Sequence, residues 1–346
     1  MYHEVPDLEF ITLTKIAITL WSGQDIDNSI IEYFIQWDQR RIDNWTDIEE
    51  SVNLKIENCQ TLPTTLKIKL MGLVKPIGKR LKAMIQYTYD NEYLPNYFTS
   101  MLTWTFLGTI NTEETIKTIL KDENLSFEKR YVLASTYCLT DDVFTLWNNL
   151  SEVDKNNYLG GIMRRNIRCH LQIYWAYHVN YSNSDTLQER IQEQFNTTFQ
   201  PCQFGLRCAL AFSNLPAVKY FSKNVPVNVK LETYWYYFHN LELREGVAFV
   251  TDQEQSVIYI PDIICFILSE LNEEQRMVSY ERYAYFILKH FLEFPFQRLF
   301  WGNAKNTCRY LTKSQKSNLL QRITRKVSEN YTDFDYETLR TELSKM

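Results

Sequence analysis

The most regular hydrophobic pattern in this chain runs from Ser126 to Leu150 and predicts two helices joined by a very short turn. The first helix has apolar rows on most of its circumference, formed by Tyr131, Ala134, Cys138, Leu133 and Tyr137. The second has a single apolar stripe, formed by Val143, Leu146, Trp147 and Leu150. A helix that is apolar on most sides is covered on both faces, whereas a striped helix is half exposed. A pair of this kind is the unit of an α-solenoid.

A weaker copy of this helix pair follows, and the pattern of its second helix recurs once more after that. The stretch PCQFGLRCALAFSNLPAVKYFSKNVP, which begins at Pro201, predicts another helix pair with a turn from Asn214 to Pro216. Its second helix is expected to match Val143, Phe144, Leu146 and Trp147 with Ala217, Val218, Tyr220 and Phe221. The stretch PDIICFILSEL predicts a third outer helix, with the same positions at Ile263, Ile264, Phe266 and Ile267. The intervals are 74 residues (217 − 143) and 46 residues (263 − 217), so the repetition is irregular. The alternative is that amphipathic helices align in this way without a repeat.

Helical spacing predicts most of the remaining elements. The predicted helices cover residues 8–21, 25–37, 45–58, 63–74, 76–89, 96–107, 112–121, 188–195 and 233–243, and the pattern from 262 to 328 stays helical. Residues 154–179 are predicted to form one long helix, or two helices if Gly160 and Gly161 interrupt it, because glycine weakens the interior of a helix. Residues 247–260 are predicted as a strand or a loop. The predicted fold class is therefore all-α, an irregular α-solenoid.

Composition adds limits on folding and location. The chain has only 9 Gly and 9 Pro, and its 23 Tyr, 20 Phe and 8 Trp supply many large rings for burial. The cysteines number seven, an odd count without a CxxC motif, and several lie on apolar helical stripes, where cysteine behaves as a small hydrophobic residue. This favours a reducing, intracellular environment such as the cytoplasm. No secretory signal is visible and no apolar run reaches about 18 residues, so no membrane contact is expected. We expect a helical region over 1–95 and a helical-repeat region over 96–346, or one continuous domain.

No catalytic, cofactor-binding or metal-binding residue is predicted. The motifs GxxxxGK[ST], GxGxxG, HExxH and GxSxG are absent. The five histidines are scattered, and His170 and His178 are farther apart than the roughly 3–5 residues usual between zinc-binding histidines. The acidic pair Asp141-Asp142 stands at a predicted helix start, where the helix dipole explains it. An enzyme of an unrecognised type stays open as an alternative.

Charge is distributed unevenly along the chain. The formal net charge is −5, yet the segment from Phe294 to Ser328 contains no acid. Its eight cations are the predicted partner-binding residues: Arg298, Lys305, Arg309, Lys313, Lys316, Arg322, Arg325 and Lys326. A second basic segment, from Lys67 to Lys82, contains six cations and no acid. Such segments bind nucleic acid or an acidic partner, and the alternative is a solvated or internally paired helix face.

The predicted function is a non-catalytic scaffold for protein–protein interaction or assembly. The apolar side of the predicted helix 314–328 leaves a basic face, formed by Lys316, Arg322, Arg325 and Lys326. We expect this face to dock on the acidic segment from Asp38 to Glu57 of another copy, so self-association is one prediction. The alternative is a helical protein that binds nucleic acid through residues 67–82 and 298–326.

The stretches LASTYCLTDDVFTLWNNL, PAVKYFSKNVP and PDIICFILSELNEEQ resemble a group of degenerate ankyrin-like helical-repeat proteins of arthropods. The resemblance extends over residues 100–330 and implies a degenerate ankyrin-like array of stacked helix pairs that binds a partner. It implies no activity and no site residues. The chain departs from ordinary ankyrin repeats, because it has no TPLHxA stretch and no glycine after each helix pair. The β-hairpin fingers of ankyrin repeats are therefore not expected.

Overall fold

The computed structural model describes residues 6–35, 41–88, 94–160, 169–181, 184–245 and 258–345. These residues are mostly helical and contain no strand, so the predicted all-α class is confirmed. Their only β contact is an isolated antiparallel bridge between Trp104 and Ile110. The chain divides into two compact units: unit 1 comprises Met1–Asn111 and Thr251–Met346, and unit 2 comprises Thr112–Val250.

This division differs from the predicted regions 1–95 and 96–346. One change of unit falls after Asn111, but the chain returns to unit 1 after Val250. The C-terminal helices therefore belong to the same unit as the first helices. Hydrophobic periodicity indicates which face of a helix is buried, and it carries no information on which distant helix covers that face.

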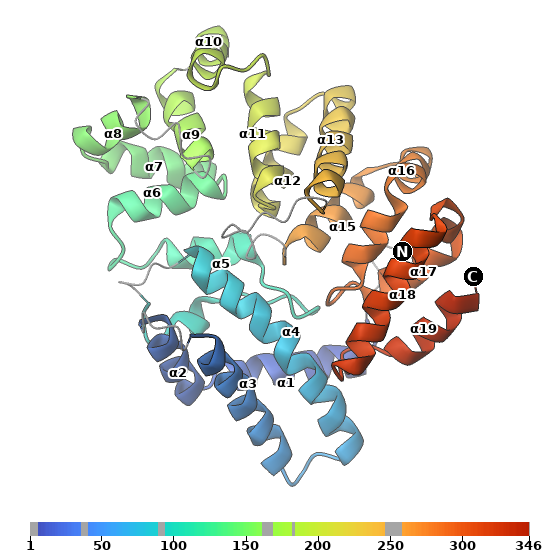
Figure 1. Cartoon of the computed structure of the whole chain (residues 1–346). Coiled ribbons are helices and arrows are strands. Elements are labelled where there is room, and N and C mark those ends of the chain that lie inside the picture. The colour runs from blue at the N-terminus through green and yellow to red at the C-terminus, as the bar shows by residue number, and fades with distance from the viewer. Residues whose placement is uncertain are drawn as a thin grey trace. The chain divides into compact units, whose positions relative to one another are not determined.

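Unit 1 consists of an N-terminal and a C-terminal group of helices (Figure 1). The N-terminal group is α1 (Leu8–Trp21), α2 (Gln24–Ile35), α3 (Arg41–Asn58), α4 (Thr64–Thr88) and the 3-10 helix η1 (Phe98–Met101). The C-terminal group is α15 (Ile260–Glu270), α16 (Glu273–Phe291), α17 (Gln297–Thr307), the 3-10 helix η4 (Cys308–Tyr310), α18 (Lys313–Ser328) and α19 (Tyr336–Lys345).

Trp21, the last residue of α1, determines how α1 packs on α4. Its side chain is fully buried, and its indole Nε1 donates a hydrogen bond of 3.1 Å to the carbonyl oxygen of Val74. Its ring stacks on that of Trp45 in α3. A Cβ atom on Gly78 would lie 2.4 Å from the Trp21 ring, closer than two carbon atoms approach without a bond. Glycine at this position therefore allows the contact between α1 and α4.

The structure of α4 shows that the predicted helix break near Pro76 is wrong. The sequence predicts two helices, over 63–74 and 76–89, but the structure has one helix with Pro76 inside it. Proline removes one backbone hydrogen bond from the helix interior. Packing offsets this loss, because Leu73, Val74 and Ile77 next to the proline are all buried.

The predicted helix over 96–107 is wrong, since only η1 is helical there. The chain then forms a tight turn around Thr105. The Thr105 hydroxyl accepts hydrogen bonds from the backbone N–H groups of Leu107 and Thr109, both at 3.3 Å. A hydroxyl that satisfies nearby backbone groups in this way competes with helix formation.

Several other predicted elements have different ends or are new. The prediction over 154–179 becomes two helices, because one ends at Leu159 and the next begins at His170. The terminal helix α19 is absent from the predictions. The predicted strand or loop over 247–260 lies mainly outside the described residues, and its last residue begins α15.

Unit 2 contains the predicted helix pairs (Figure 1). Its described helices are α5 (Thr112–Ile119), α6 (Phe127–Thr136), α7 (Thr140–Asn149), α8 (Glu152–Leu159), α9 (His170–Asn180), α10 (Ser184–Phe195), α11 (Pro201–Ala211), α12 (Leu215–Lys223) and α13 (Val227–Glu245).

The pairs α6–α7 and α11–α12 have the same kind of turn. Ser126 caps α6, as predicted, by accepting a hydrogen bond from the backbone N–H of Lys129. Each turn contains one residue with a positive φ, Cys138 (56°) in the first pair and Ser213 (51°) in the second. In both turns the next backbone N–H donates to a carbonyl five residues earlier, a Schellman-type helix end.

Equivalent positions of the two pairs are 75 residues apart (213 − 138), one more than predicted. Val218 therefore stands where Val143 stands, and both are fully buried. Phe221 matches Leu146 instead of the predicted Trp147. The sequence allows either alignment of the two pairs, because the second stripe contains adjacent apolar residues. The turn that decides between the two alignments is not visible in the hydrophobic pattern. The third predicted copy, α15, belongs to unit 1.

A buried polar network connects both pairs to α9. The side chain of Asn214 donates to the carbonyl oxygen of Thr136 at 2.7 Å, and Gln172 of α9 donates to the Thr136 hydroxyl at 2.6 Å. The hydroxyl of Tyr131 donates to the carbonyl oxygen of Gln172 at 2.8 Å. Since each of these groups is hydrogen-bonded, their burial fixes the orientation of α6, α9 and α12 within unit 2.

The contact between α11 and α12 leads to the first prediction. A Cβ atom on Gly205 would lie 2.3 Å from the ring of Phe221. Although alanine favours a helix over glycine by about 1 kcal/mol, we expect Gly205→Ala to destabilise the protein by about 1–3 kcal/mol through overpacking. Urea unfolding followed by circular dichroism measures this loss, and Gly205→Ala/Phe221→Leu should recover part of it. A Gly205→Ala variant as stable as the wild type would contradict the packing.

Candidate functional site

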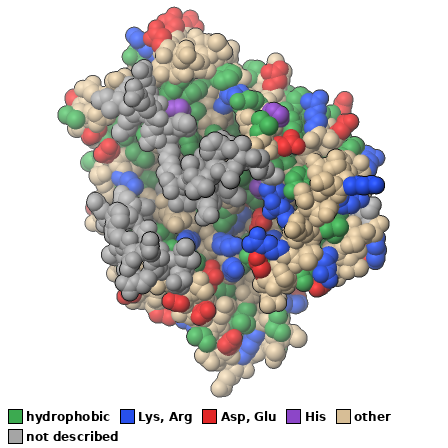
Figure 2. Space-filling model, in the orientation of Figure 1, with side chains coloured by type: hydrophobic (Ala, Val, Ile, Leu, Met, Phe, Trp, Pro, Cys, Tyr) green, Lys and Arg blue, Asp and Glu red, His purple; other side chains and the backbone are tan. Residues whose placement is uncertain are grey.

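The two basic segments predicted from the sequence meet in unit 1. A pocket of about 600 Å³ is lined by residues of α4, α16 and α18. A second hollow of about 760 Å³ continues it, because six residues line both: Lys79, Lys289, Glu293, Arg322, Lys326 and Tyr331. We call this space the basic cleft, and its cations are Lys79, Arg80, Lys82, Lys289, Arg322, Arg325 and Lys326. Figure 2 shows Lys and Arg side chains gathered around a hollow in the face that it draws.

Helical spacing places the cations of α4 and α18 toward the cleft. Residues three or four apart in a helix lie on one face, which on α4 groups Lys79 and Lys82, and both line the cleft. On α18, Arg322 and Lys326 are four residues apart and both line the cleft. The other side of α18 is anchored in the core by Leu319 and Ile323, both fully buried. The same amphipathic pattern that buries one side of α18 therefore presents its cations on the other.

Tyr331 joins the two basic segments. The ammonium groups of Lys75 and Lys79 on α4 lie 5.1 Å and 5.6 Å from the centre of its ring, and that of Lys326 on α18 lies 4.7 Å from it. Lys79 also donates a hydrogen bond of 3.2 Å to the tyrosine hydroxyl. Each cation is attracted to the electron-rich face of the ring. One aromatic side chain thus holds three cations that would otherwise repel one another.

The loop that carries Tyr331 approaches α4 closely. It begins at Asn330, which has a positive φ of 54° and ends α18. A Cβ atom on Gly72 of α4 would lie 2.5 Å from the Thr332 hydroxyl and 2.7 Å from its carbonyl carbon. A residue with a side chain at position 72 would push this loop away, so Gly72 permits the approach that forms one wall of the cleft.

Among the described residues that line the cleft, the acids Glu293, Glu329 and Asp333 are fewer than the cations. Glu293 binds Lys326 at 3.1 Å, and Glu329 binds Arg325 at 2.6 Å. Arg322 makes no ion pair within the part of the chain that the structure describes. The surplus of positive charge makes the cleft attractive to anions.

Arg80 lies at the bottom of the cleft and has a structural role. Only 2% of its side chain is exposed. Its guanidinium binds Asp262 of α15 at 2.9 Å and donates a hydrogen bond of 3.0 Å to the carbonyl oxygen of Phe294. These bonds tie α4 to the C-terminal group of helices.

Burial and neighbouring charge shift the pKa of three groups in the cleft. Burial, together with the nearby Arg322, lowers the pKa of Lys289 to about 8. Burial lowers the pKa of His290 to about 3, and the neighbouring cations add to this effect. Burial raises the pKa of Asp333 to about 6. Asp333 accepts a hydrogen bond of 2.7 Å from Gln297, which holds it in the wall of the cleft. The surroundings of His290 and Asp333 explain their shifts without a catalytic role.

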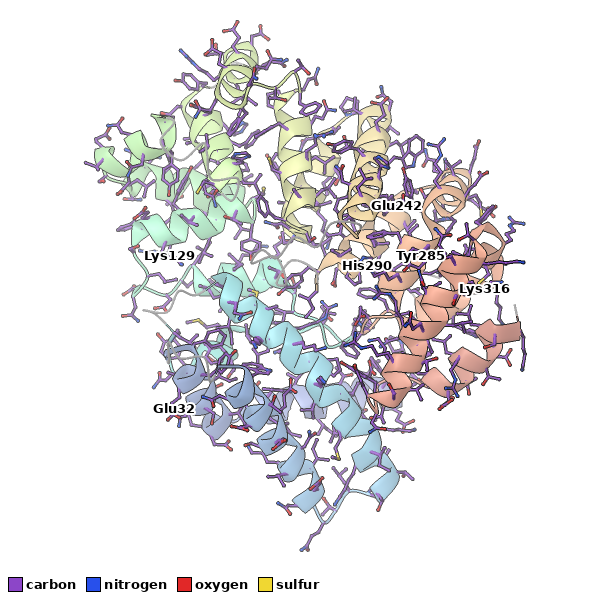
Figure 3. The ribbon with its side chains drawn as sticks, in the orientation of Figure 1. Glu32, Lys129, Glu242, Tyr285, His290 and Lys316 are labelled. Atoms are coloured by element: carbon purple, nitrogen blue, oxygen red, sulfur yellow. The ribbon has the colours of Figure 1, made fainter. Side chains whose placement is uncertain are left out.

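The predicted partner-binding residues divide into two sets. Three of them line the basic cleft: Arg322, Arg325 and Lys326. The other five do not: Arg298, Lys305, Arg309, Lys313 and Lys316. Two of these lie against aromatic rings, Lys305 over Trp301 at 4.9 Å and Arg309 over Tyr310 at 4.8 Å. Figure 3 labels Lys316 on α18, and Tyr285 and His290 on α16.

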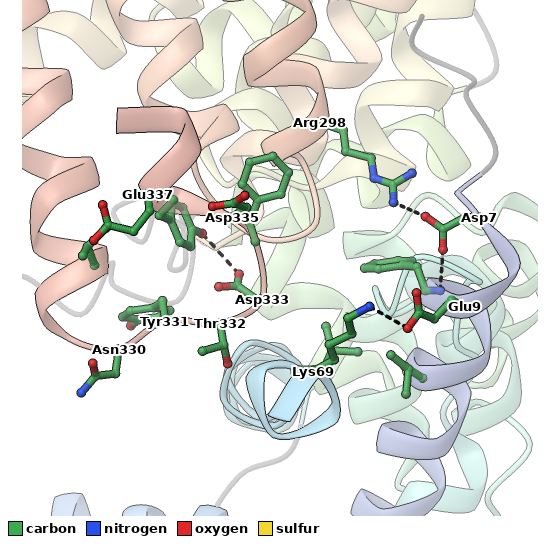
Figure 4. A pocket seen from close by; sticks show the side chains of 16 residues that line it. Asp7, Glu9, Lys69, Arg298, Asn330, Tyr331, Thr332, Asp333, Asp335 and Glu337 are labelled. Atoms are coloured by element: carbon green, nitrogen blue, oxygen red, sulfur yellow. Dashed lines mark hydrogen bonds and ion pairs between the residues drawn. The ribbon is translucent and has the colours of Figure 1, made fainter. Parts of the chain in front are cut away.

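Arg298 lies in a neighbouring pocket of about 640 Å³ in unit 1, which shares Tyr331 and Asp333 with the basic cleft. It forms an ion pair with Asp7, the N-cap of α1, and Lys69 of the first basic segment binds Glu9 at 2.7 Å (Figure 4). Here the acids outnumber the cations, and both cations are paired. The polarity of this pocket is therefore opposite to that of the basic cleft.

The sequence pattern missed the contribution of α16 and of the loop after α18. Lys289 is the clearest case, because it follows the buried residues Ile287 and Leu288 and resembles a helix position at the edge of the core. Tyr331 stands just after the predicted helical pattern, which ends at residue 328. No local signal identifies either residue, since both acquire their importance only from helices that are distant in sequence.

No described helix is long and apolar enough to cross a bilayer. Within the described ranges, no three His, Cys, Asp or Glu side chains are close enough together to hold a metal ion. None of the seven cysteines, all of which lie in the described ranges, forms a disulfide bond. Comparison with known proteins gives no match to this chain, whether among family models, curated proteins or solved structures.

Proposed function

We propose that this protein is a non-catalytic binding scaffold and that its basic cleft engages an anionic group of a partner. The observation that supports this most directly is that cations from α4, α16 and α18 converge on one cleft. A relation to ankyrin-like repeat proteins and an intracellular location are part of the same proposal.

The cleft is built before any partner arrives. Tyr331 holds Lys79 and Lys326 in place, and the buried pair of Arg80 and Asp262 ties α4, which carries Lys79, to α15. Cations that are already positioned lose little side-chain freedom on binding, so more of the electrostatic attraction contributes to affinity. The surplus charge also attracts an anionic partner over a distance and raises the association rate.

A second copy of the chain is one candidate partner, through the acidic segment from Asp38 to Glu57. Part of this segment faces the same molecule, because Glu49 is half-buried beside the lysines of α4, which act against the rise in its pKa that burial causes. Asp47 and Glu50 of α3 are exposed and remain able to contact another molecule.

Charge reversal tests the proposed function. Fluorescently labelled poly-glutamate is titrated with the wild type and with Arg322→Glu/Arg325→Glu, and light scattering follows the mass of each protein. We expect at least about tenfold weaker binding for the variant, because each lost ionic hydrogen bond contributes about 1.5–3 kcal/mol. Lys313→Glu is the control, since Lys313 is exposed on the same helix outside the cleft. Equal affinity of all three proteins for poly-glutamate would reject the cleft as the binding site. A constant monomer mass would reject self-association.

Nucleic acid is the second candidate partner. The observation that favours nucleic acid is that the two hollows are continuous, so that the basic cleft is longer than a single pocket. Binding to phosphates falls steeply with salt. Single-stranded RNA that binds more tightly than poly-glutamate, and only with Arg322 and Arg325 present, would move this function to first place.

A further inference from the structure

We propose that the basic cleft is a site for a compact ligand with two or more phosphate monoester groups. This inference rests on the proposed function and specifies the chemistry of the anion. The cleft, with a pocket of about 600 Å³, has the size of a small-molecule site.

The placement of the cations on three helices supports a compact ligand. They come from three helices, with Lys79 and Lys82 on α4, Lys289 on α16, and Arg322 and Lys326 on α18. A small ligand between these helices can contact all three at once. The planar guanidinium of Arg322 can bind two phosphate oxygens together, whereas the lysines act as point charges around it.

The density of charge favours phosphate over carboxylate. Lys289 is half-buried among other cations, which is why its pKa is lowered to about 8. A phosphate monoester carries about −1.5 to −2 charges at pH 7, so one group can offset two neighbouring cations. An acidic peptide supplies one charge per residue, and each residue adds about 3.3–3.6 Å of chain. Fewer carboxylates than phosphate charges therefore fit into the same volume.

The aromatic residues of the cleft argue against stacked nucleic-acid bases. Binding of a single strand usually needs successive exposed rings. The ring of Tyr331 already contacts Lys75, Lys79 and Lys326, and Phe294 is buried. Tyr285 lines only the second hollow. The cleft thus offers many contacts for phosphate groups and few surfaces for bases.

Calorimetry with fructose 1,6-bisphosphate tests this site. We expect binding that weakens between about 20 mM and about 150 mM salt. Glucose 6-phosphate, with one phosphate group, and the Arg322→Gln variant should each reduce the affinity at least about tenfold, because ionic hydrogen bonds are lost. Lys313→Gln is the matched control on α18 and should bind like the wild type. Circular dichroism checks that each variant is folded.

The outcomes separate this inference from the proposed function. Binding of poly-glutamate that requires Arg322, without binding of the bisphosphate, overturns the phosphate site and leaves the scaffold function standing. Absence of binding for poly-glutamate, the bisphosphate and RNA overturns both. Equal affinity for the two sugar phosphates overturns the requirement for two phosphate groups. RNA that binds more tightly than the bisphosphate through the same residues identifies nucleic acid as the ligand.

The pH dependence supplies an independent measurement. The charged groups that share the cleft with Lys289 are Arg322, Arg325 and Lys326 of α18, Lys79, Arg80 and Lys82 of α4, and the acids Glu293, Glu329 and Asp333, with the neutral His290 beside Lys289. Lys289 loses its charge above a pH of about 8, whereas phosphate monoesters are already fully ionised above their second pKa of about 6. We therefore expect the affinity to fall from about pH 7.5 to about pH 9.5, with proton uptake on binding. Lys289→Arg keeps the charge and should flatten this profile, and an unchanged profile would exclude Lys289 from the site.

Discussion

Replacing Trp147 with alanine is expected to destabilise the protein by about 3–5 kcal/mol, the usual cost of removing a large buried aromatic side chain. Trp147 is only 4% exposed. Its ring centre lies 5.3 Å from that of Tyr131 in α6 and 6.4 Å from that of Tyr158 in α8. The truncation therefore leaves a cavity between three helices of unit 2, which the neighbouring rings cannot fill without losing their own contacts.

Phe144 provides the control for Trp147, because it belongs to the same helix and is 42% exposed. Phe144→Ala should cost much less, since a partly exposed side chain leaves no closed cavity. Urea unfolding followed by circular dichroism and by tryptophan fluorescence compares the two variants. Similar midpoints for Trp147→Ala and the wild type would show that α7 does not pack through this stripe.

A second large effect is expected for Arg80→Met. Methionine fills much of the volume but leaves Asp262 without the guanidinium that balances its charge, and removing one partner of a buried ion pair costs about 3–5 kcal/mol. The Asp262 side chain is only 14% exposed, so water can compensate little. The carbonyl oxygen of Phe294 also loses its hydrogen bond from Arg80. The midpoint of thermal unfolding measures this loss of stability in unit 1.

The matched variant is Arg80→Met/Asp262→Asn, which removes both charges. It should be more stable than Arg80→Met alone, because no buried charge then lacks its counterpart. If the double variant loses at least as much stability as the two single variants together, the two residues do not act as a pair.

Local structure was predictable where one residue determines it. The predicted range 8–21 coincides with α1, and Ser126 caps α6 as its position suggested. Each of these features depends on the spacing of nearby residues. Pro76 led to an error, because the cost of a proline in a helix is a local quantity, whereas the packing that offsets it comes from other helices.

The candidate site was only half predictable, for a related physical reason. The absence of acids from two segments drew attention to Lys79 and Arg322, whose charge is visible in the sequence. Their proximity depends on Gly72, Tyr331 and the long-range bonds of Arg80. Such contacts join residues that are 182 positions (262 − 80) to 260 positions (332 − 72) apart, and no periodicity within a helix encodes them.

The discontinuity of unit 1 has a consequence for synthesis of the protein on the ribosome. Unit 2 is a continuous stretch with its own buried core, so it can fold as soon as it has left the exit tunnel. α4 is made early, but the helices that complete its surroundings follow only after unit 2. Between Lys79 and Lys326 lie 247 positions (326 − 79), which take roughly 12–50 s to translate at about 5–20 residues per second. During this interval the buried face of α4 lacks its C-terminal partners, which makes the nascent chain a candidate for chaperone binding.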